Sequence, residues 1–104
     1  MGGRPDQTDG AVKERTVVKQ EPPRLYHVVL LNDDYSTMQF VVDVLESLFE
    51  KMPAEAHRIM MQVHVNGRGI AGVYPWEVAE TKADKVASLA SHAGHPLRAT
   101  VEEV

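Results

Sequence analysis

Cysteine is absent from this 104-residue sequence, which excludes a disulfide framework and any cysteine-ligated metal site. No apolar run approaches the roughly 20 residues that a membrane-spanning helix needs. The N-terminus lacks the apolar centre of a secretory signal, and Asp6 stands where a myristoylation signal starting at Gly2 would have Ser or Thr. We therefore expect a cytoplasmic protein that does not enter a membrane.

Positive charge is scarce in most of the chain. Residues 25–104 contain six Lys or Arg side chains against eleven Asp or Glu, whereas residues 1–24 contain five against four. An acidic domain repels the phosphate backbone of DNA or RNA. The charge distribution therefore argues against nucleic acid as a partner.

Two regions differ in composition. Residues 1–24 combine glycine, proline and alternating charges with few side chains to bury, so we expect a flexible N-terminal extension. The remaining residues, 25–104, contain the apolar patterns of one small folded domain.

The apolar patterns of residues 25–104 alternate between strand and helix. Leu25–Leu31 reads as a covered strand, and Ser36 with Gln39 forms a capping-box pattern that predicts a helix from Ser36 with apolar spacing to Met52. Pro53 predicts the start of a second helix that ends at Asn66-Gly67. A strand over 70–74, a helix over 76–92 and a strand over 97–102 complete the order. This order predicts an α+β domain, in which a three-stranded antiparallel sheet packs on three helices.

A polar cluster, Asn32-Asp33-Asp34, stands where the first strand ends and a helix is about to start. A local reading is that these residues hydrogen-bond their own backbone in a turn. A second reading is a metal site formed by Asp33, Asp34 and His64, although no His-Glu-x-x-His pattern supports it. A hydrolase is a third reading, but Ser36 is better explained as a helix cap than as a nucleophile.

Four stretches resemble the ClpS adaptor family: LLNDDYSTMQFVVDVLESLF, IMMQVHVNG, GVYPWEVAETKADKV and HPLRATVE. They occur in the family's order and span nearly all of residues 25–103. The resemblance implies a non-catalytic, monomeric adaptor that requires no cofactor or metal. Such adaptors bind substrate proteins with a bulky hydrophobic N-terminal residue (Phe, Tyr, Trp or Leu) and deliver them to a ClpA-type AAA+ unfoldase of the ClpP protease.

The resemblance also implies residue roles. Asn32, Asp34 and His64 would surround the substrate's α-ammonium group, which carries three donors that need acceptors. His64 accepts only while one ring nitrogen is unprotonated, so binding should weaken at acid pH. A hydrophobic pocket for the first side chain would be formed by Leu31, Ser36, Met38, Val41, Met60, Val63 and Leu97. Tyr35, Glu77 and Lys82 would contact the N-terminal domain of the unfoldase, and residues 1–24 would assist delivery.

This sequence departs from the family pattern at several positions. Ser36-Thr37 stands where the family often has Thr-Pro, and Met61 and Ala71 replace frequent leucine and cysteine. These changes leave the expected ammonium ligands in place but bear on the ranking among substrate residues. An alternative is an interaction domain of the same fold, such as a ribosomal-stalk-like domain or an unfoldase modulator that does not bind N-terminal residues.

Overall fold

The computed structural model describes residues 21–104, so the expected extension over residues 1–24 lies outside the described residues except for its last four. The elements follow in the predicted order: β1 (Leu25–Leu31), α2 (Met38–Leu48), α3 (Pro53–Asn66), β2 (Arg68–Pro75), α4 (Trp76–Ala93) and β3 (Arg98–Glu103). The predicted α+β class is confirmed. Among residues 21–104, no helix is both long enough and apolar enough to cross a membrane.

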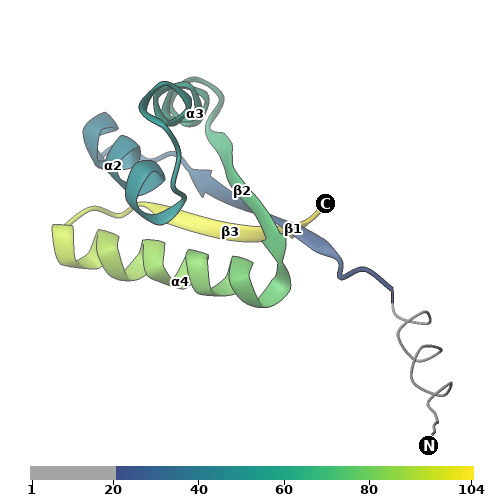
Figure 1. The fold of residues 1–104 in the computed structure, drawn as a ribbon. Coiled ribbons are helices and arrows are strands. Elements are labelled where there is room, and N and C mark those ends of the chain that lie inside the picture. Colours follow the sequence, from purple (N-terminus) through teal and green to yellow (C-terminus); the bar gives the residue numbers. More distant parts are fainter. Residues whose placement is uncertain (1–20) are drawn as a thin grey trace, which may run out of the picture.

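The three strands form one antiparallel sheet in the order β2-β1-β3. Strand β1 is therefore central, and a register shift between Val28 and Val29 interrupts its pairing with β2. The backbone amide of Val104 donates to the carbonyl of Leu25 (3.2 Å), which places the C-terminal end beside the start of β1 (Figure 1). The opposite end of β1 leads directly into the polar cluster.

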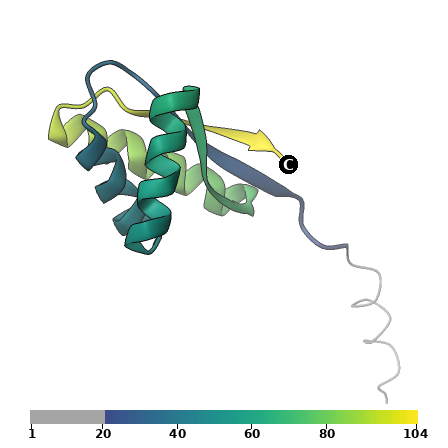
Figure 2. The same ribbon diagram turned by 90° about the horizontal axis from the view of Figure 1, so that it is seen from above.

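Helices α2, α3 and α4 share one hydrophobic core with the sheet. Val28 and Leu30 of β1 are fully buried and join a cluster with buried residues of α2, α3 and α4. Helix α4 runs along the sheet and contacts all three strands, while α2 and α3 pack against each other near the end of β1 (Figure 2). The end of β1 and the α2–α3 pair therefore both belong to elements that are fixed by the core.

The N-cap of helix α2 lies one residue later than predicted, and the helix itself begins at Met38. Thr37, not Ser36, is the N-cap, and its Oγ1 accepts from the backbone amide of Phe40 at 3.0 Å. The predicted capping box is also wrong, because the side-chain amide of Gln39 donates to Asp43 instead. The hydroxyl of Ser36 makes no hydrogen bond within the described residues, and its backbone amide donates to the carboxylate of Asp33. Ser36 thus belongs to the turn that precedes the helix.

The same helix also ends earlier than the apolar spacing suggested. The last helical residue is Leu48, and Met52, expected on the buried stripe, is 74% exposed. Glu50 adopts a left-handed φ of 55°, a conformation that interrupts a helix. The amide of Lys51 then donates back to the carbonyl of Leu45 at 3.1 Å. This early end directs the chain into α3, which starts at Pro53 as predicted.

The turn after α3 places the helix against β2. Gly67 is left-handed (φ 88°), and its amide donates to the carbonyl of Val63 at 3.0 Å, which confirms the predicted stop at Asn66-Gly67. A Cβ at Gly69 would lie only 2.8 Å from Cγ2 of Val63. The glycine therefore allows β2 to approach α3 closely, and this approach sets the position of Val63 and of His64 beside it.

Candidate functional site: a pocket between the β1–α2 loop and α3

The loop over residues 32–37 connects β1 to α2 and forms one wall of the candidate site. Its first residue is fixed to α3, because the backbone amide of Asn32 donates to the carbonyl of Gly67 at 2.9 Å. Its last residue, Thr37, caps α2. The loop is therefore anchored at both ends to the elements that enclose the site.

Asp33 orders the middle of this loop. Its Oδ1 accepts hydrogen bonds from the backbone amides of Tyr35 (2.7 Å) and Ser36 (2.6 Å). Partial burial acts to raise the pKa of the Asp33 carboxyl, but hydrogen bonds from Ser36 and Tyr35 and the nearby charge of His95 outweigh it, so the pKa lies below its ordinary value of 3.8. The local-turn reading of the polar cluster is confirmed for Asp33.

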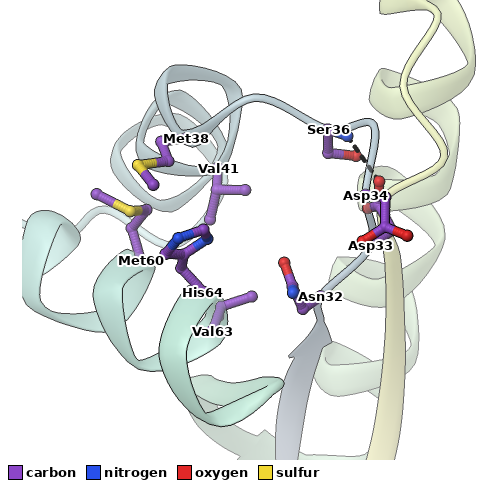
Figure 3. Close-up of a pocket in the computed structure, with 9 residues that line it drawn as sticks. All are labelled: Asn32, Asp33, Asp34, Ser36, Met38, Val41, Met60, Val63 and His64. Carbon is purple, nitrogen blue, oxygen red and sulfur yellow. Dashed lines mark hydrogen bonds between the residues drawn. The ribbon is translucent and has the colours of Figure 1, made fainter.

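A pocket of about 280 Å³ lies between this loop and the helices α2 and α3. Figure 3 shows the loop residues on one side of the pocket and the helical side chains facing them. The volume falls just below the roughly 300–1,000 Å³ typical of sites for drug-sized ligands. Nine residues line the pocket: Asn32, Asp33, Asp34, Ser36, Met38, Val41, Met60, Val63 and His64.

The three predicted ammonium-binding residues come together at this pocket. Asn32 and Asp34 come from the loop, His64 comes from the last turn of α3, and all three are exposed. Within residues 21–104, no hydrogen bond or ion pair joins their side chains to another residue. An amide oxygen, a carboxylate and an imidazole nitrogen are hydrogen-bond acceptors. The pocket thus offers a set of acceptors that have no donor among residues 21–104.

The apolar part of the pocket comes from α2 and α3. Val41, Met60 and Val63 are 6%, 3% and 2% exposed and belong to the hydrophobic core, whereas Met38, at the first turn of α2, is 45% exposed. The floor of the pocket is therefore continuous with the core, and the flexible thioether of Met38 lies nearer to solvent. Five of the seven residues predicted for the hydrophobic pocket line it.

The other two predicted pocket residues, Leu31 and Leu97, are not among the lining residues. Neighbouring side chains of a strand point to opposite faces, and Leu30 is the β1 residue that joins the core cluster, so Leu31 faces the other side of the sheet. Leu97 is 3% exposed and packs in the core just before β3. The roles predicted for these two residues in substrate binding therefore stay predictions.

Asp33 lines the pocket but was not among the predicted substrate-binding or pocket residues. The sequence signal that could have indicated its role is the known preference of Asp for accepting backbone hydrogen bonds two and three residues ahead.

Asp33, Asp34 and His64 all line the pocket, as the metal-site reading requires. Nevertheless, the part of the chain that the structure describes contains no group of three His, Asp or Glu side chains placed to hold one metal ion.

The three residues predicted to contact an unfoldase occupy different settings. Tyr35 is 79% exposed in the β1–α2 loop, and Glu77 is exposed in the first turn of α4. Lys82 is partly buried, and its ammonium group donates to the carbonyl of Leu48 at 2.6 Å. The same ammonium group lies 5.9 and 5.6 Å from the ring centres of Phe49 and Tyr74. Lys82 therefore contributes to the end of α2 from inside the domain.

Comparison with known proteins places these features in a family. Residues 21–100 match the model of the family described as ATP-dependent Clp protease adaptor protein ClpS. A protein of Paraburkholderia xenovorans (strain LB400), named ATP-dependent Clp protease adapter protein ClpS, is 46% identical over 99 residues. The protein of the same name from Burkholderia mallei (strain SAVP1) is 48% identical over 99 residues. Each alignment covers 95% of this chain and 95% of the relative.

A solved structure supports the same assignment. The structure of Agrobacterium tumefaciens ClpS2 bound to L-phenylalaninamide matches this fold with a TM-score of 0.76 and 40% sequence identity. The match covers 80% of this chain and 100% of that chain. The matched family region, residues 21–100, includes the β1–α2 loop and α3, and thus every residue that lines the pocket.

Proposed function

Because this chain belongs to the ClpS family of Clp protease adaptor proteins, we propose that its pocket recognises other proteins by their N-terminal residue. The adaptor binds the free α-amino group and the bulky hydrophobic side chain of that residue, which is Phe, Tyr, Trp or Leu. It then delivers the bound protein to a ClpA-type AAA+ unfoldase of the ClpP protease. The adaptor carries out no chemistry of its own.

The observation that carries this proposal is the convergence of Asn32, Asp34 and His64 on one pocket without partners among residues 21–104. An α-ammonium group has three N–H donors and one positive charge, so it can satisfy three acceptors at once. An internal peptide bond offers one N–H and no charge. The three acceptors therefore favour a chain terminus over any internal residue.

The apolar wall accounts for the preference for a bulky side chain. Val41, Met60 and Val63 form a surface from which a bound hydrocarbon side chain displaces water, and burial of a Leu or Phe side chain contributes roughly 1.5–3 kcal/mol. The pocket volume suits one residue rather than an extended ligand. L-Phenylalaninamide, bound in the structure of Agrobacterium tumefaciens ClpS2, combines a free α-amino group with one aromatic side chain.

Delivery requires a second surface and a partner. We assign contact with the N-terminal domain of the unfoldase to Tyr35, Glu77 and Lys82, and assistance in delivery to residues 1–24. The adaptor acts as a cytoplasmic monomer. Family membership supports these assignments, as does the exposure of Tyr35 and Glu77.

The proposal is tested by titrating the full chain with fluorescent peptides that differ only in their first residue. Peptides that begin with Phe, Tyr, Trp or Leu should bind with a Kd on the order of micromolar or tighter, once the bonds to the ammonium group and side-chain burial are set against the cost of association. Peptides that begin with Gly or Ser lack the buried side chain and should bind at least about tenfold more weakly. Equal binding of all peptides would contradict the proposal and favour an unfoldase modulator of the same fold.

A further inference from the structure

We infer that the two adjacent carboxylates of the β1–α2 loop have different tasks: Asp33 is a positioning residue that shapes the loop, and Asp34 meets the substrate. This inference deepens the proposed function and rests on it. The sequence alone treats Asp33 and Asp34 as an equivalent pair, since both follow Asn32 at the end of a strand. Their surroundings in the fold separate them.

Asp33 is committed to the backbone of its own loop. Its Oδ1 accepts from the amides of both Tyr35 and Ser36, at 2.7 and 2.6 Å, and these short bonds close a turn around Asp34, which lies between the bonded residues. The dashed line in Figure 3 marks the bond from Ser36. The backbone on either side of Asp34 is therefore held by its neighbour's side chain, which limits the directions in which Asp34 can point.

Asp34 shows the opposite pattern. Its side chain is exposed at the pocket and makes no hydrogen bond or ion pair with any residue between positions 21 and 104. A carboxylate in this state can accept hydrogen bonds from a ligand without losing bonds to the protein. Of the two neighbours, only Asp34 has its full acceptor capacity available to an ammonium group.

The bonds of Asp33 complete a set of loop restraints. Asn32 is tied to Gly67 at one end, and Thr37 caps α2 at the other, but neither contact fixes the residues between them. The Asp33 turn supplies that restraint. The ring of His95 stacks on that of Phe40, with 4.4 Å between the ring centres. A positive charge on His95 favours the ionised form of Asp33. The loop is thus ordered before a substrate arrives, which reduces the entropy cost of binding.

The decisive experiment compares two neutral isosteres, Asp33→Asn and Asp34→Asn, in the full chain. An Asn side chain keeps an oxygen that can accept both backbone hydrogen bonds. The second oxygen of Asp33, Oδ2, is buried and has no partner among the described residues, so its replacement by an amide nitrogen breaks no bond to them. In contrast, Asp34→Asn removes the negative charge that faces the ammonium group. Affinity for a peptide with a free N-terminal Phe is measured by fluorescence anisotropy, and folding is followed by thermal unfolding.

We expect Asp33→Asn to bind the peptide within about threefold of the unchanged protein, because the turn is retained. Asp34→Asn should weaken binding by about tenfold or more, because a charge-assisted hydrogen bond becomes a neutral one. Asp33→Ala, which removes the acceptor, should weaken binding by about tenfold as two backbone bonds are lost. Rescue by Asn but not by Ala indicates a requirement for the acceptor and not for the charge.

Equal loss of affinity in Asp33→Asn and Asp34→Asn would overturn the inference, since it would show that the charge of Asp33 also acts on the substrate. A folded Asp33→Ala variant that binds normally would overturn it as well. If Asp33→Ala does not fold, the two Asn variants still decide the question. Failure of the proposed function has a different signature, because the unchanged protein would then not bind the Phe peptide at all.

Discussion

The pocket and the surface of α4 use polar side chains in opposite ways. At the pocket, Asn32, Asp34 and His64 come from two separate elements, converge on one cavity and have no side-chain partner within residues 21–104. On α4, Glu77 and Lys82 are five residues apart, so they do not share a helix face, and Lys82 bonds to Leu48 inside the domain. Convergent, unpartnered groups indicate a common ligand, whereas dispersed groups do not.

The same difference separates the two parts of the proposed function, which are recognition of a substrate and attachment to an unfoldase. The proposed recognition of an N-terminal residue rests on the geometry of a single pocket. The proposed attachment to an unfoldase rests instead on Glu77 in the first turn of α4 and on Tyr35, whose loop lies near His95 just beyond the C-terminal end of that helix. An 18-residue helix is about 27 Å long, so a partner that touches both residues must cover this whole side.

The largest expected effect comes from the double substitution of Asp34 and His64 by Ala. Peptides with a free N-terminal Phe should lose about 100-fold in affinity or more, because two charge-assisted hydrogen bonds contribute roughly 1.5–3 kcal/mol each. The free energy of unfolding should change little, since both side chains are exposed. Isothermal titration and thermal unfolding measure the two quantities. His57→Ala, an exposed histidine of α3 that does not line the pocket, is the matched control, and equal losses in both proteins would contradict the assignment.

Lys82→Met should have the reverse pattern of effects. We expect the free energy of unfolding to fall by about 1–2 kcal/mol, because the carbonyl of Leu48 loses its charged donor and two aromatic rings lose their cation. Peptide affinity should stay within about twofold, as the pocket is not lined by Lys82. Chemical denaturation checks the stability, with the exposed Lys85→Met as control. Unchanged stability would contradict a structural role for the hydrogen bond from Lys82 to Leu48.

Glu77→Gln should affect only the proposed attachment. A single exposed charge at the rim of an interface contributes about 0.2–1 kcal/mol, so affinity for an isolated unfoldase N-terminal domain should fall by roughly two- to fivefold. The decrease should be smaller at high salt. Surface plasmon resonance at two ionic strengths measures the effect, and Glu80→Gln on the same helix is the control. If both substitutions lower the affinity equally, the effect arises from general electrostatic attraction and not from a specific contact of Glu77.

The smallest effect concerns pH and Asp33. Because its folded-state pKa lies below the ordinary value of 3.8, the ionised Asp33 stabilises the fold at pH values above 3.8, and this contribution is lost as pH falls through the folded-state pKa. The Asp33→Asn variant has no carboxyl group at this position, so it lacks this pH-dependent contribution. The difference in Tm between the two proteins should therefore be constant near neutral pH and decrease below about pH 4. A difference that grows on acidification would reverse the sign of the proposed linkage.

Much of the fold could be predicted from the sequence because each element carries a local signal. Pro53 and Gly67 bound α3 as expected, and the order of the elements was correct. The errors lie where two local signals compete. Ser36 and Thr37 can both cap a helix. In the structure the amide of Ser36 donates to Asp33 in the preceding turn, and Thr37 is the cap. Met52 continues the apolar spacing of α2, but the left-handed Glu50 ends the helix before it.

The pocket could be predicted only in part, for a related reason. Helical spacing cannot distinguish a residue that lines a cavity from one that packs in the core, since Met60 and Val63 do both. Leu31 and Leu97 are not among the lining residues, and Leu97 belongs to the hydrophobic core. The loop over residues 32–37 and His64 lie about thirty residues apart in the sequence, so no local pattern indicates that they meet. The family resemblance implied this grouping, and the structure places both at the pocket.

The central claim is that this pocket reads a free N-terminus, and one pair of peptides tests it most directly. Two fluorescent peptides of identical sequence begin with Phe, and one of them is acetylated at its α-amino group. Anisotropy titration should show tight binding of the free peptide and no measurable binding of the acetylated one, which keeps the aromatic side chain but loses the charge and two of three donors. Equal binding of the two peptides would contradict the claim.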